Sequence, residues 1–426
     1  MQTSFSLAQL ADADLHEANK ILRNCVHCGF CTATCPTYVL LGDELDSPRG
    51  RIYLIKQMLE RGEPATPKVV KHLDRCLSCL SCMTACPSGV HYMHLVDQGR
   101  RRIEATYRRP FLDRALRRVL ATVLPRPGLF RLALLGAQLA RPLAPLLPAR
   151  LAAMLRLAAS PAHAPSPVDR PQVFPAEGTR KKRVALLTGC VQPVIDPAIN
   201  EATIRILTRH GCEVVVAKGV GCCGALEHHL GRESLDRVRT NVDAWSAEAA
   251  EAGLDAIVIN ASGCGTMVKD YGFLLREDAR YAEPAAHVSA LAKDVSELLH
   301  ELGLPAPAVA TGQRVAYHSA CSLQHGQKIH SVPRELLQRA GFTVLDVPEG
   351  HLCCGSAGTY NMLQPELADA LKARKLAHLA SIGPEMVAAG NIGCITQLRS
   401  GGGVPVLHTV ELLDWATGGP KPVALG

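Results

Sequence analysis

The spacing of apolar and polar positions divides the chain into a helical first part and a second part in which strands and helices alternate. In the first part, several stretches carry apolar residues every three or four positions, as one face of a helix does. One helix is predicted to start at Ser47-Pro48, an N-cap followed by proline at the first helical position. Its buried face would carry Ile52, Ile55, Met58 and Leu59. A short amphipathic helix near the N-terminus is also predicted, with a buried face formed by Leu7, Leu10, Leu15 and Leu22.

After residue 183, short apolar runs typical of strands alternate with helical patterns. Each run is followed by a helix-like stretch, so an α/β fold with mostly parallel strands is predicted. The expected strands are residues 184–188, 213–217, 255–260, 314–318, 343–347, 386–391 and 404–408.

The cysteines of this second part occur in two matching sets. The first set is Cys190, Cys222, Cys223 and Cys264, and the second, 130 or 131 positions later, is Cys321, Cys353, Cys354 and Cys394. A constant offset indicates two copies of one unit. Because the loops after parallel strands gather at one edge of a sheet, the four thiols of each copy are expected to converge. They could hold an iron-sulfur cluster or zinc, or they could be buried or redox-active thiols. Cys212, which aligns with Phe342, is expected in the core.

The helical first part contains two cysteine runs with the same spacing, C-x2-C-x2-C-x3-C-P. This spacing places three thiolates around one [4Fe-4S] cube and sends the fourth to a neighbouring cube. One cluster is therefore predicted on Cys25, Cys28, Cys31 and Cys86, and a second on Cys76, Cys79, Cys82 and Cys35. Zinc sites use two-cysteine knuckles and disulfides need an oxidising compartment, so both fit less well. Since a helix is predicted between the runs, an all-helical ferredoxin domain is expected.

Composition and charge narrow the choice of function. The chain has 426 residues, of which 47% are hydrophobic, so it can build several cores. Seventeen cysteines and an N-terminus without the apolar core of an export signal indicate metal ligation in a reducing compartment. Aromatic residues make up only 4%, and no nucleic-acid-binding motif occurs, so nucleic acid is not an expected partner. A cluster of arginines could be a solvated face or a surface for an acidic partner or anionic lipid: Arg100, Arg101, Arg102, Arg108, Arg109, Arg114, Arg117 and Arg118.

A segment rich in Leu, Ala, Pro and Arg separates the two parts. Its uncharged stretches are far shorter than the roughly 20 apolar residues that span a bilayer. It could lie at a membrane interface or pack on its own domain. A proline-rich linker is expected from Ser160 to Arg183. The expected domains are 1–118 (ferredoxin), 119–182 (Leu/Arg/Pro-rich segment and linker), 183–310 (first repeat) and 311–426 (second repeat).

The duplicated unit resembles the cysteine-rich CCG domain of heterodisulfide reductases and related oxidoreductases. The resemblance implies that each copy binds a noncubane iron-sulfur cluster or zinc. In that family the unit commonly ends in C-x-x-C, whereas Cys264 and Cys394 stand alone here. A site with four ligands in each copy is therefore expected rather than one with five.

The whole chain resembles the bacterial glycolate oxidase iron-sulfur subunits, a family with an α plus α/β architecture. The resemblance is carried by Ile21–Arg23, Leu41–Tyr53, Ala261–Gly265 and His351–Tyr360. It implies flavin-containing partner subunits that oxidise glycolate to glyoxylate, a quinone or other membrane acceptor, and a cytoplasmic place on the inner face of the cytoplasmic membrane. Because iron-sulfur clusters take up single electrons, this chain is not expected to oxidise glycolate alone.

Three alternatives stay open at this point. The chain could serve a related lactate or glycerol-3-phosphate dehydrogenase. It could be a catalytic subunit of the heterodisulfide-reductase type, with its site in the duplicated unit. It could also be a binding module whose zinc-filled repeats only assemble a complex.

Overall fold

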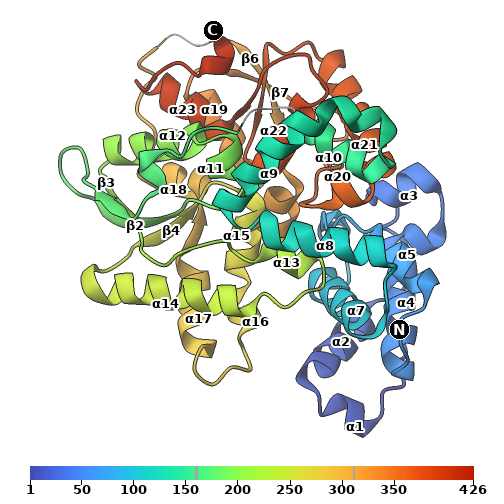
Figure 1. Cartoon of the computed structure of the whole chain (residues 1–426). Helices are drawn as coiled ribbons and strands as arrows, with labels where there is room; N and C mark the ends of the chain where they lie inside the picture. Colours follow the sequence, from blue (N-terminus) through green and yellow to red (C-terminus); the bar gives the residue numbers. More distant parts are fainter. Residues whose placement is uncertain (159–161, 310–311) are drawn as a thin grey trace.

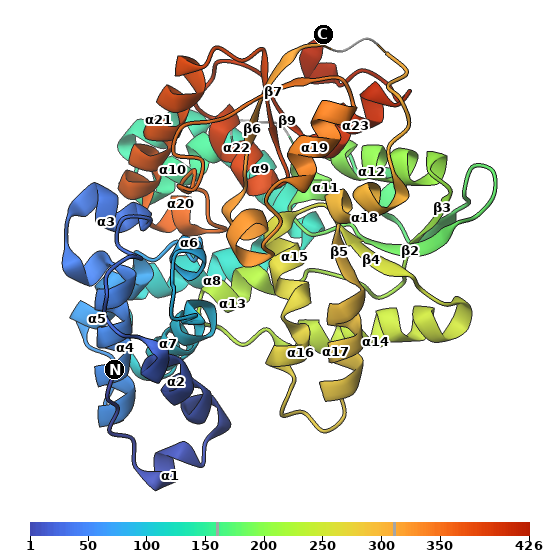
Figure 2. The same ribbon diagram turned by 180° about the vertical axis from the view of Figure 1, so that it is seen from behind.

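The computed structural model describes residues 1–158, 162–309 and 312–426. A helical domain lies to one side of two sheet-containing units, and helices α8 (Phe111–Val123), α9 (Pro127–Ala140) and α10 (Ala149–Leu157) lie across them (Figures 1 and 2). The predicted fold class, a helical ferredoxin domain followed by a duplicated α/β unit, is confirmed. The start of the predicted linker and the predicted boundary between the repeats lie outside the described residues.

The N-terminal domain is built of short helices around the predicted helix α4. The Ser47 hydroxyl accepts a hydrogen bond from the Gly50 amide, and Pro48 is the first helical residue, as predicted. The predicted inward residues of α4 are all buried. Leu7, however, is 89% exposed, because α1 ends after four residues and does not continue into α2. The elements are α1 (Leu7–Leu10), α2 (Ala13–Asn24), α3 (Pro36–Leu41), η1 (Glu44–Asp46), α4 (Pro48–Arg61), α5 (Pro67–Asp74), α6 (Ser81–Thr84) and α7 (Tyr92–Thr106).

Some of the clustered arginines lie inside the protein rather than on its surface. Arg109 is buried and pairs with Asp74, Glu104 and Asp113, and Arg117 shares two of these carboxylates. Asp74 lies on α5 and Glu104 lies on α7, so these pairs hold the start of α8 (Phe111–Val123) against both helices. Part of the cluster is therefore an internal ion-pair network.

The segment after α7 forms α8 (Phe111–Val123), α9 (Pro127–Ala140), η2 (Arg141–Leu146) and α10 (Ala149–Leu157), followed by η3 (Pro167–Asp169). It packs on the rest of the chain through Leu120, Phe130 and Leu134, which are buried with Val194 and Leu230 of the first repeat. Among the described residues, no helix has both the length and the apolar character that a membrane span requires.

The two repeats contain sheets with the same strand order. The first sheet is ordered β1-β3-β2-β4-β5, and the second is ordered β7-β6-β8-β9. All pairs are parallel except β1 with β3. The strands are β1 (Gln172–Phe174), β2 (Lys182–Leu187), β3 (Cys212–Val216), β4 (Ala256–Ile259), β5 (Ala292–Asp294), β6 (Arg314–His318), β7 (Thr343–Leu345), β8 (Met386–Ala389) and β9 (Val406–His408).

All seven predicted strands are present, and two further strands were missed. β1 lies within the predicted linker, and β5 precedes α18. β1 lies between Pro171 and Pro175, and β5 reads Ala-Lys-Asp, so neither shows the apolar run from which β7 and β9, which are equally short, were predicted. Cys212 is fully buried at the start of β3, which confirms the prediction of a core residue.

Helices cover both sheets and join the repeats through one core. Buried residues of β2, β4, β6, β8, α12 and α23 form a single apolar cluster. Asp414 on α23 pairs with Arg205 and Arg209 on α12. The helical elements are α11 (Gln192–Ile195), α12 (Ala198–Arg209), α13 (Ala225–His229), α14 (Leu235–Ala252), α15 (Ser262–Lys269), α16 (Tyr271–Leu274), α17 (Ala282–Leu291), α18 (Val295–Leu302), η4 (Ser322–Gly326), α19 (Val332–Arg339), α20 (Tyr360–Leu363), α21 (Pro365–Ser381), α22 (Ile392–Arg399), α23 (Thr409–Ala416) and η5 (Val423–Leu425).

Candidate iron-sulfur centres

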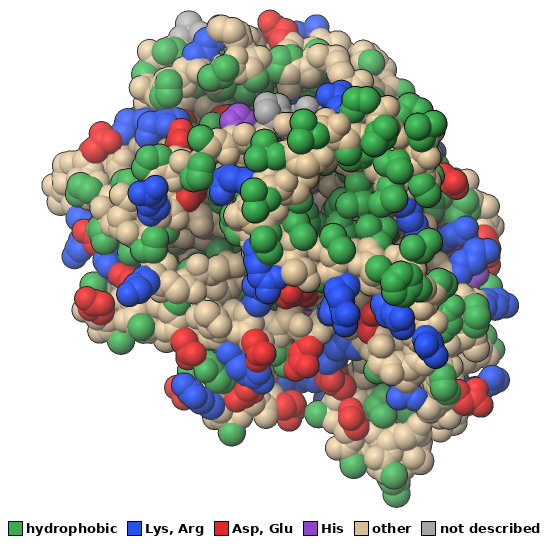
Figure 3. Space-filling view, viewed as in Figure 1, with side chains coloured by type: hydrophobic (Ala, Val, Ile, Leu, Met, Phe, Trp, Pro, Cys, Tyr) green, Lys and Arg blue, Asp and Glu red, His purple; other side chains and the backbone are tan. Residues whose placement is uncertain are grey.

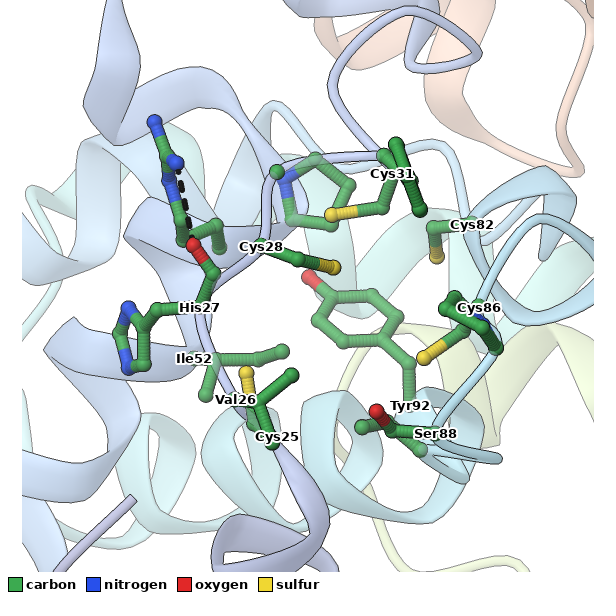
Figure 4. Close-up of a pocket in the computed structure, with 16 residues that line it drawn as sticks. Cys25, Val26, His27, Cys28, Cys31, Ile52, Cys82, Cys86, Ser88 and Tyr92 are labelled. Carbon is green, nitrogen blue, oxygen red and sulfur yellow. Dashed lines mark hydrogen bonds between the residues drawn. The ribbon is translucent and has the colours of Figure 1, made fainter.

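The first predicted cluster site is a pocket between the loop after α2 and the loop after α6. Cys25, Cys28 and Cys31 come from the first loop, and Cys86 comes from the second. Their sulfur atoms point into a common space, and Cys82 lies at its edge (Figure 4). The structure thus brings the last cysteine of the second run to the first three cysteines of the first run.

The second site lies directly beside the first and shows the reciprocal exchange. It is lined by Cys76, Cys79 and Cys82 of the second run and by Cys35 of the first. Pro48, Cys82 and Tyr92 line both pockets, so the two sites share a wall. The arrangement fits the predicted ligand sets, and ligation itself stays a prediction.

The backbone of both cysteine loops has the same unusual conformation. His27 and Gly29 of the first loop have positive φ angles of 58° and 85°, and Ser78 and Leu80 at the matching positions have 51° and 61°. Side chains other than glycine rarely adopt this region. When residues with positive and negative φ alternate, successive backbone N–H groups point toward one concave side of the loop, and this arrangement binds anionic clusters. Both loops are therefore shaped to surround an anion.

Cationic and hydrogen-bonding groups surround the second pocket. Arg51 is fully buried, and its Nη1 donates to Cys35 Sγ at 3.7 Å. Burial alone would lower the pKa of Arg51, but the Cys76 thiol and other nearby acidic groups outweigh it and raise that pKa. Arg100 donates to the Cys76 carbonyl, and Tyr92 Oη donates to Cys76 Sγ at 3.6 Å. A negative charge in this pocket is therefore stabilised from several sides.

The donor set fits two iron-sulfur cubes. All seventeen cysteines are free, so no disulfide competes for these thiols. Burial raises the pKa of Cys79 and Cys82 well above the usual value, and burial raises the pKa of Cys31 to about 11. Thiols gathered this closely become thiolates when a metal neutralises them. Four thiols, inward amides and buried cations together suit an anionic cluster.

The second repeat brings its four cysteines together and adds a histidine. Cys321 Sγ lies 3.8 Å from Cys353 Sγ. A nitrogen of His318 and the sulfurs of Cys354 and Cys394 lie within 4.8 Å of one another. Within the described part of the chain, His318 Nε2 has no hydrogen-bond partner. Burial lowers the pKa of His318 to about 3, so the ring is neutral and can act as a ligand.

The second repeat lies against the second cube pocket. Cys79 and Cys353 are buried in one apolar cluster, with Cys321 packed against it. Burial raises the pKa of Cys79 well above its usual value, and the nearby Cys321 thiol raises it further. His325 also contacts this region, since its Nδ1 lies 2.8 Å from Thr84 Oγ1 on α6.

The first repeat gathers its own four thiols at the carboxyl ends of β2, β3 and β4. Hydrogen bonds from Cys190 and Cys223 lower the pKa of Cys222, and Cys223 is also hydrogen bonded to Cys264. The Gly224 amide donates to Cys222 Sγ at 3.5 Å. The four thiols converge as predicted, and what they bind stays a prediction.

The two repeat sites meet through a small polar network. Ser262, next to the first site, lies 2.7 Å from Ser322 Oγ and accepts a hydrogen bond of 2.8 Å from Asn391 Nδ2. Ser322 follows Cys321, and Asn391 precedes Cys394. The thiol sets therefore follow one another through the molecule: first cube pocket, second cube pocket, second repeat, first repeat.

The loop between β3 and α13, residues 219–224, has the glycine spacing of a dinucleotide-binding loop. Such a loop needs a helix N-terminus that faces a pyrophosphate. Here α13 has only five residues. In the middle of the loop, the Cys222 thiol is hydrogen bonded to Cys190 and the Cys223 thiol to Cys264. The loop therefore belongs to the thiol site.

Several residues of these sites carried no readable signal in the sequence. Tyr92 and Arg100 lie outside the cysteine runs, and Arg51 stood out only as part of a family segment. His318 is one of several histidines near cysteines, and a histidine in such a place is structural by default. That role suits His228, which pairs with Asp97 of α7 at 3.1 Å. His318 differs because it has a free ring nitrogen among thiols.

Comparisons with known proteins agree with this arrangement. The 4Fe-4S dicluster domain family matches residues 24–90, and the cysteine-rich domain family matches residues 184–269 and 315–399. The glycolate oxidase iron-sulfur subunit of Escherichia coli is 48% identical over 98% of this chain and 99% of its own length. A probable glycolate oxidase iron-sulfur subunit of Bacillus subtilis is 31% identical over 93% of this chain and 94% of its own. A crystal structure of a hypothetical protein from Helicobacter pylori, with a TM-score of 0.53 and 10% identity, covers 97% of this chain and 74% of that one, and it shows a similar fold alone.

Proposed function

The chain belongs to the family of glycolate oxidase iron-sulfur subunits, and from this premise we propose that it carries electrons from glycolate to a membrane acceptor. It is an iron-sulfur electron-transfer subunit of an oxidoreductase. In the proposal, a flavin-containing partner oxidises glycolate to glyoxylate, and a quinone or another membrane acceptor receives the electrons. Clusters bound to this chain would supply one-electron steps between them.

The observation that carries the proposal is the unbroken series of thiol sets. Cys82 and Tyr92 line both cube pockets, and Cys79 of the second pocket packs with Cys353 of the second repeat. Ser262 and Ser322 then join the two repeat sites. A subunit that only held a complex together would not need four sets of thiols that adjoin one another.

The exposed side of the first pocket supports an entry point there. Cys28 is exposed, and its neighbours Val26 and Phe30 are each 66% exposed. Apolar side chains of this size on a surface favour contact with another protein. In the proposal the flavin-containing partner docks on this loop, at the end of the series farthest from the first repeat.

The occupants of the repeat sites are part of the proposal. Each of the two cube pockets would hold one [4Fe-4S] cluster. Each repeat would hold a further iron-sulfur cluster or zinc on its four thiols. The likeness to glycolate oxidase subunits extends over nearly the whole chain, which favours glycolate over lactate or glycerol 3-phosphate as the partner's substrate.

Substitution of Cys28 tests the proposal. In the assembled complex, Cys28→Ser should abolish acceptor reduction while glycolate still bleaches the partner's flavin, because only the path after the flavin is broken. Cys212→Ser is the matched control, since Cys212 is buried at the start of β3, at the opposite end of that strand from the thiols of the first repeat. Normal turnover of the Cys28→Ser complex with its natural acceptor would refute the conduit.

A further inference from the structure

A large apolar cavity lies beside the thiols of the first repeat. Its volume is about 440 Å³, within the range of sites that bind small organic ligands. It lies between helices α8, α9 and α10 and the loops that follow β2, β3 and β4. Figure 3 shows hydrophobic side chains gathered around a hollow over α9 and α10. The cavity is far larger than the two cube pockets and is not needed to hold a metal.

The inner end of this cavity combines the four thiols with polar atoms that lack partners. Cys190, Cys222, Cys223 and Cys264 all line it. Gln192, which is 2% exposed, lines it with a buried Oε1 that has no hydrogen-bond partner among the described residues.

Two more polar groups share this property. His229 Nδ1 and Asn361 Oδ1 also line the cavity, and both are buried without a partner in the described part of the chain. An unpaired buried polar atom destabilises a fold, so such atoms point to a ligand that completes them. Because Gln192 Oε1 and Asn361 Oδ1 can only accept, a ligand that completes them must carry hydrogen-bond donors.

The outer end is apolar and continues onto the surface. Leu120, Phe130, Leu134 and Met154 line the cavity between the helices. Around them the surface of η2 and α9 exposes further leucines: Leu132, Leu135, Leu139, Leu143 and Leu146. An exposed apolar area of this kind marks a site for an apolar partner.

We propose that this cavity binds a lipophilic quinone, with the ring at the thiols of the first repeat and the apolar tail between α9 and α10. The proposal rests on the function proposed above and makes the first repeat the place where electrons leave the chain. The hydroxyl groups of the quinol can donate to Gln192 Oε1 and Asn361 Oδ1, and a carbonyl oxygen of the quinone can accept from the His229 ring. The apolar tail matches the outer lining. A phospholipid would instead place its charged head at the apolar mouth.

The chemistry balances without any further reactant. Glycolate loses two electrons and two protons at the partner and becomes glyoxylate. The quinone ring takes up two electrons and two protons and becomes the quinol, and the protons reach its oxygens from water. His229 can hand on such a proton, because a neutral imidazole has one nitrogen that donates and one that accepts.

Photolabelling of the complex tests binding directly. The probe is an azidoquinone with a decyl tail, and the labelled peptides are identified by mass spectrometry. Label on α9, α10 or the loop at Cys222 that is competed away by decylubiquinone supports the proposal. Label elsewhere, or label that decylubiquinone does not compete, overturns it. A phospholipid found tightly bound in the cavity by native mass spectrometry, with no label there, overturns it as well.

A pair of tryptophan variants, one in the cavity lining and one away from it, tests function. Ala137→Trp places a bulky ring in the lining, and Ala247→Trp, a matched control, places the same ring on the exposed face of α14, away from the cavity. Ala137→Trp should lower the ratio of decylubiquinone to ferricyanide turnover about tenfold, since overpacking of this size weakens binding by about that factor. Ala247→Trp should leave the ratio unchanged. An unchanged ratio for both variants overturns the proposal.

The two proposals fail in different ways. If glycolate reduces neither ferricyanide nor the chain's clusters in the complete complex, the proposed electron path fails. Photolabelling does not require turnover, so it still decides whether the cavity binds a quinone. If the electron path works and the label lies elsewhere, only the assignment of the quinone site is wrong.

Discussion

The hydroxyl of Tyr92 offers a sharp test of how the protein tunes its second cube site. Tyr92 is buried in the wall between the two pockets, and its Oη donates to Cys76 Sγ at 3.6 Å. A hydrogen bond to a ligand sulfur stabilises the reduced, more negative cluster and so raises its reduction potential. Tyr92→Phe removes this hydrogen bond and keeps the ring that separates the pockets.

The size of the effect follows from the strength of one hydrogen bond. A typical bond contributes about 0.5–1.5 kcal/mol, and about 1.4 kcal/mol corresponds to 59 mV for a one-electron couple. The cluster on Cys76, Cys79, Cys82 and Cys35 should therefore become harder to reduce by roughly 20–60 mV. Only the part of the bond energy that differs between the two redox states counts, so the lower half of this range is expected. The other cluster should shift much less, because the hydroxyl is bonded to Cys76.

A redox titration followed by electron paramagnetic resonance on anaerobically purified protein measures both potentials. Tyr271→Phe is the matched control, since its buried hydroxyl donates to the Cys223 carbonyl in the first repeat. The reasoning fails if the potential of the second cluster rises or stays constant in Tyr92→Phe. It also fails if both clusters shift equally, because the hydroxyl would then act through the general field of the domain.

Three further predictions address the repeats, the helical domain and their contact. His318→Leu should lower the metal content of the second repeat, measured as iron and zinc per chain, because it removes the free ring nitrogen beside Cys354 and Cys394. Arg109→Met should lower the free energy of unfolding by about 1.5–3 kcal/mol in thermal or denaturant unfolding, since Glu104 loses its partner and Arg117 is left to pair with Asp74 and Asp113. The pair of His228 with Asp97 should stabilise the chain most below about pH 6.5 and lose effect as pH rises through the raised pKa of His228, measured as the stability difference from His228→Gln.

The sign of the last prediction follows from the two protonation states. Burial lowers the pKa of His228, but the charge of Asp97 outweighs burial and raises it above the ordinary value. The folded state therefore holds the proton more tightly than the unfolded state, and deprotonation at high pH removes that stabilisation. A stability difference that grows with pH would contradict the pair's role. Unchanged metal content in His318→Leu, or an unfolding curve of Arg109→Met that matches the wild type, would contradict the other two.

Local patterns in the sequence predicted most of the elements that build the sites. Ser47 and Pro48 define the start of α4 by themselves, because capping depends on a few neighbouring residues. Seven strands were recognisable from their apolar runs, whereas β1 and β5, which lack such a run, were not. Leu7 was placed on the wrong side because its helix stops after one turn. Periodicity assumes that a helix continues, and that assumption failed there.

The sequence by itself determined which thiols belong together, since cysteine spacing and a constant offset between repeats are properties of the chain alone. Only the tertiary structure decided which sites are neighbours: Cys79 lies against Cys353, and the thiols of the first repeat face an apolar cavity. It also decided that Arg51, Tyr92 and His318 reach the thiol sets. These contacts join residues far apart in the chain, and their distances depend on how whole elements pack, which no local pattern of residues encodes.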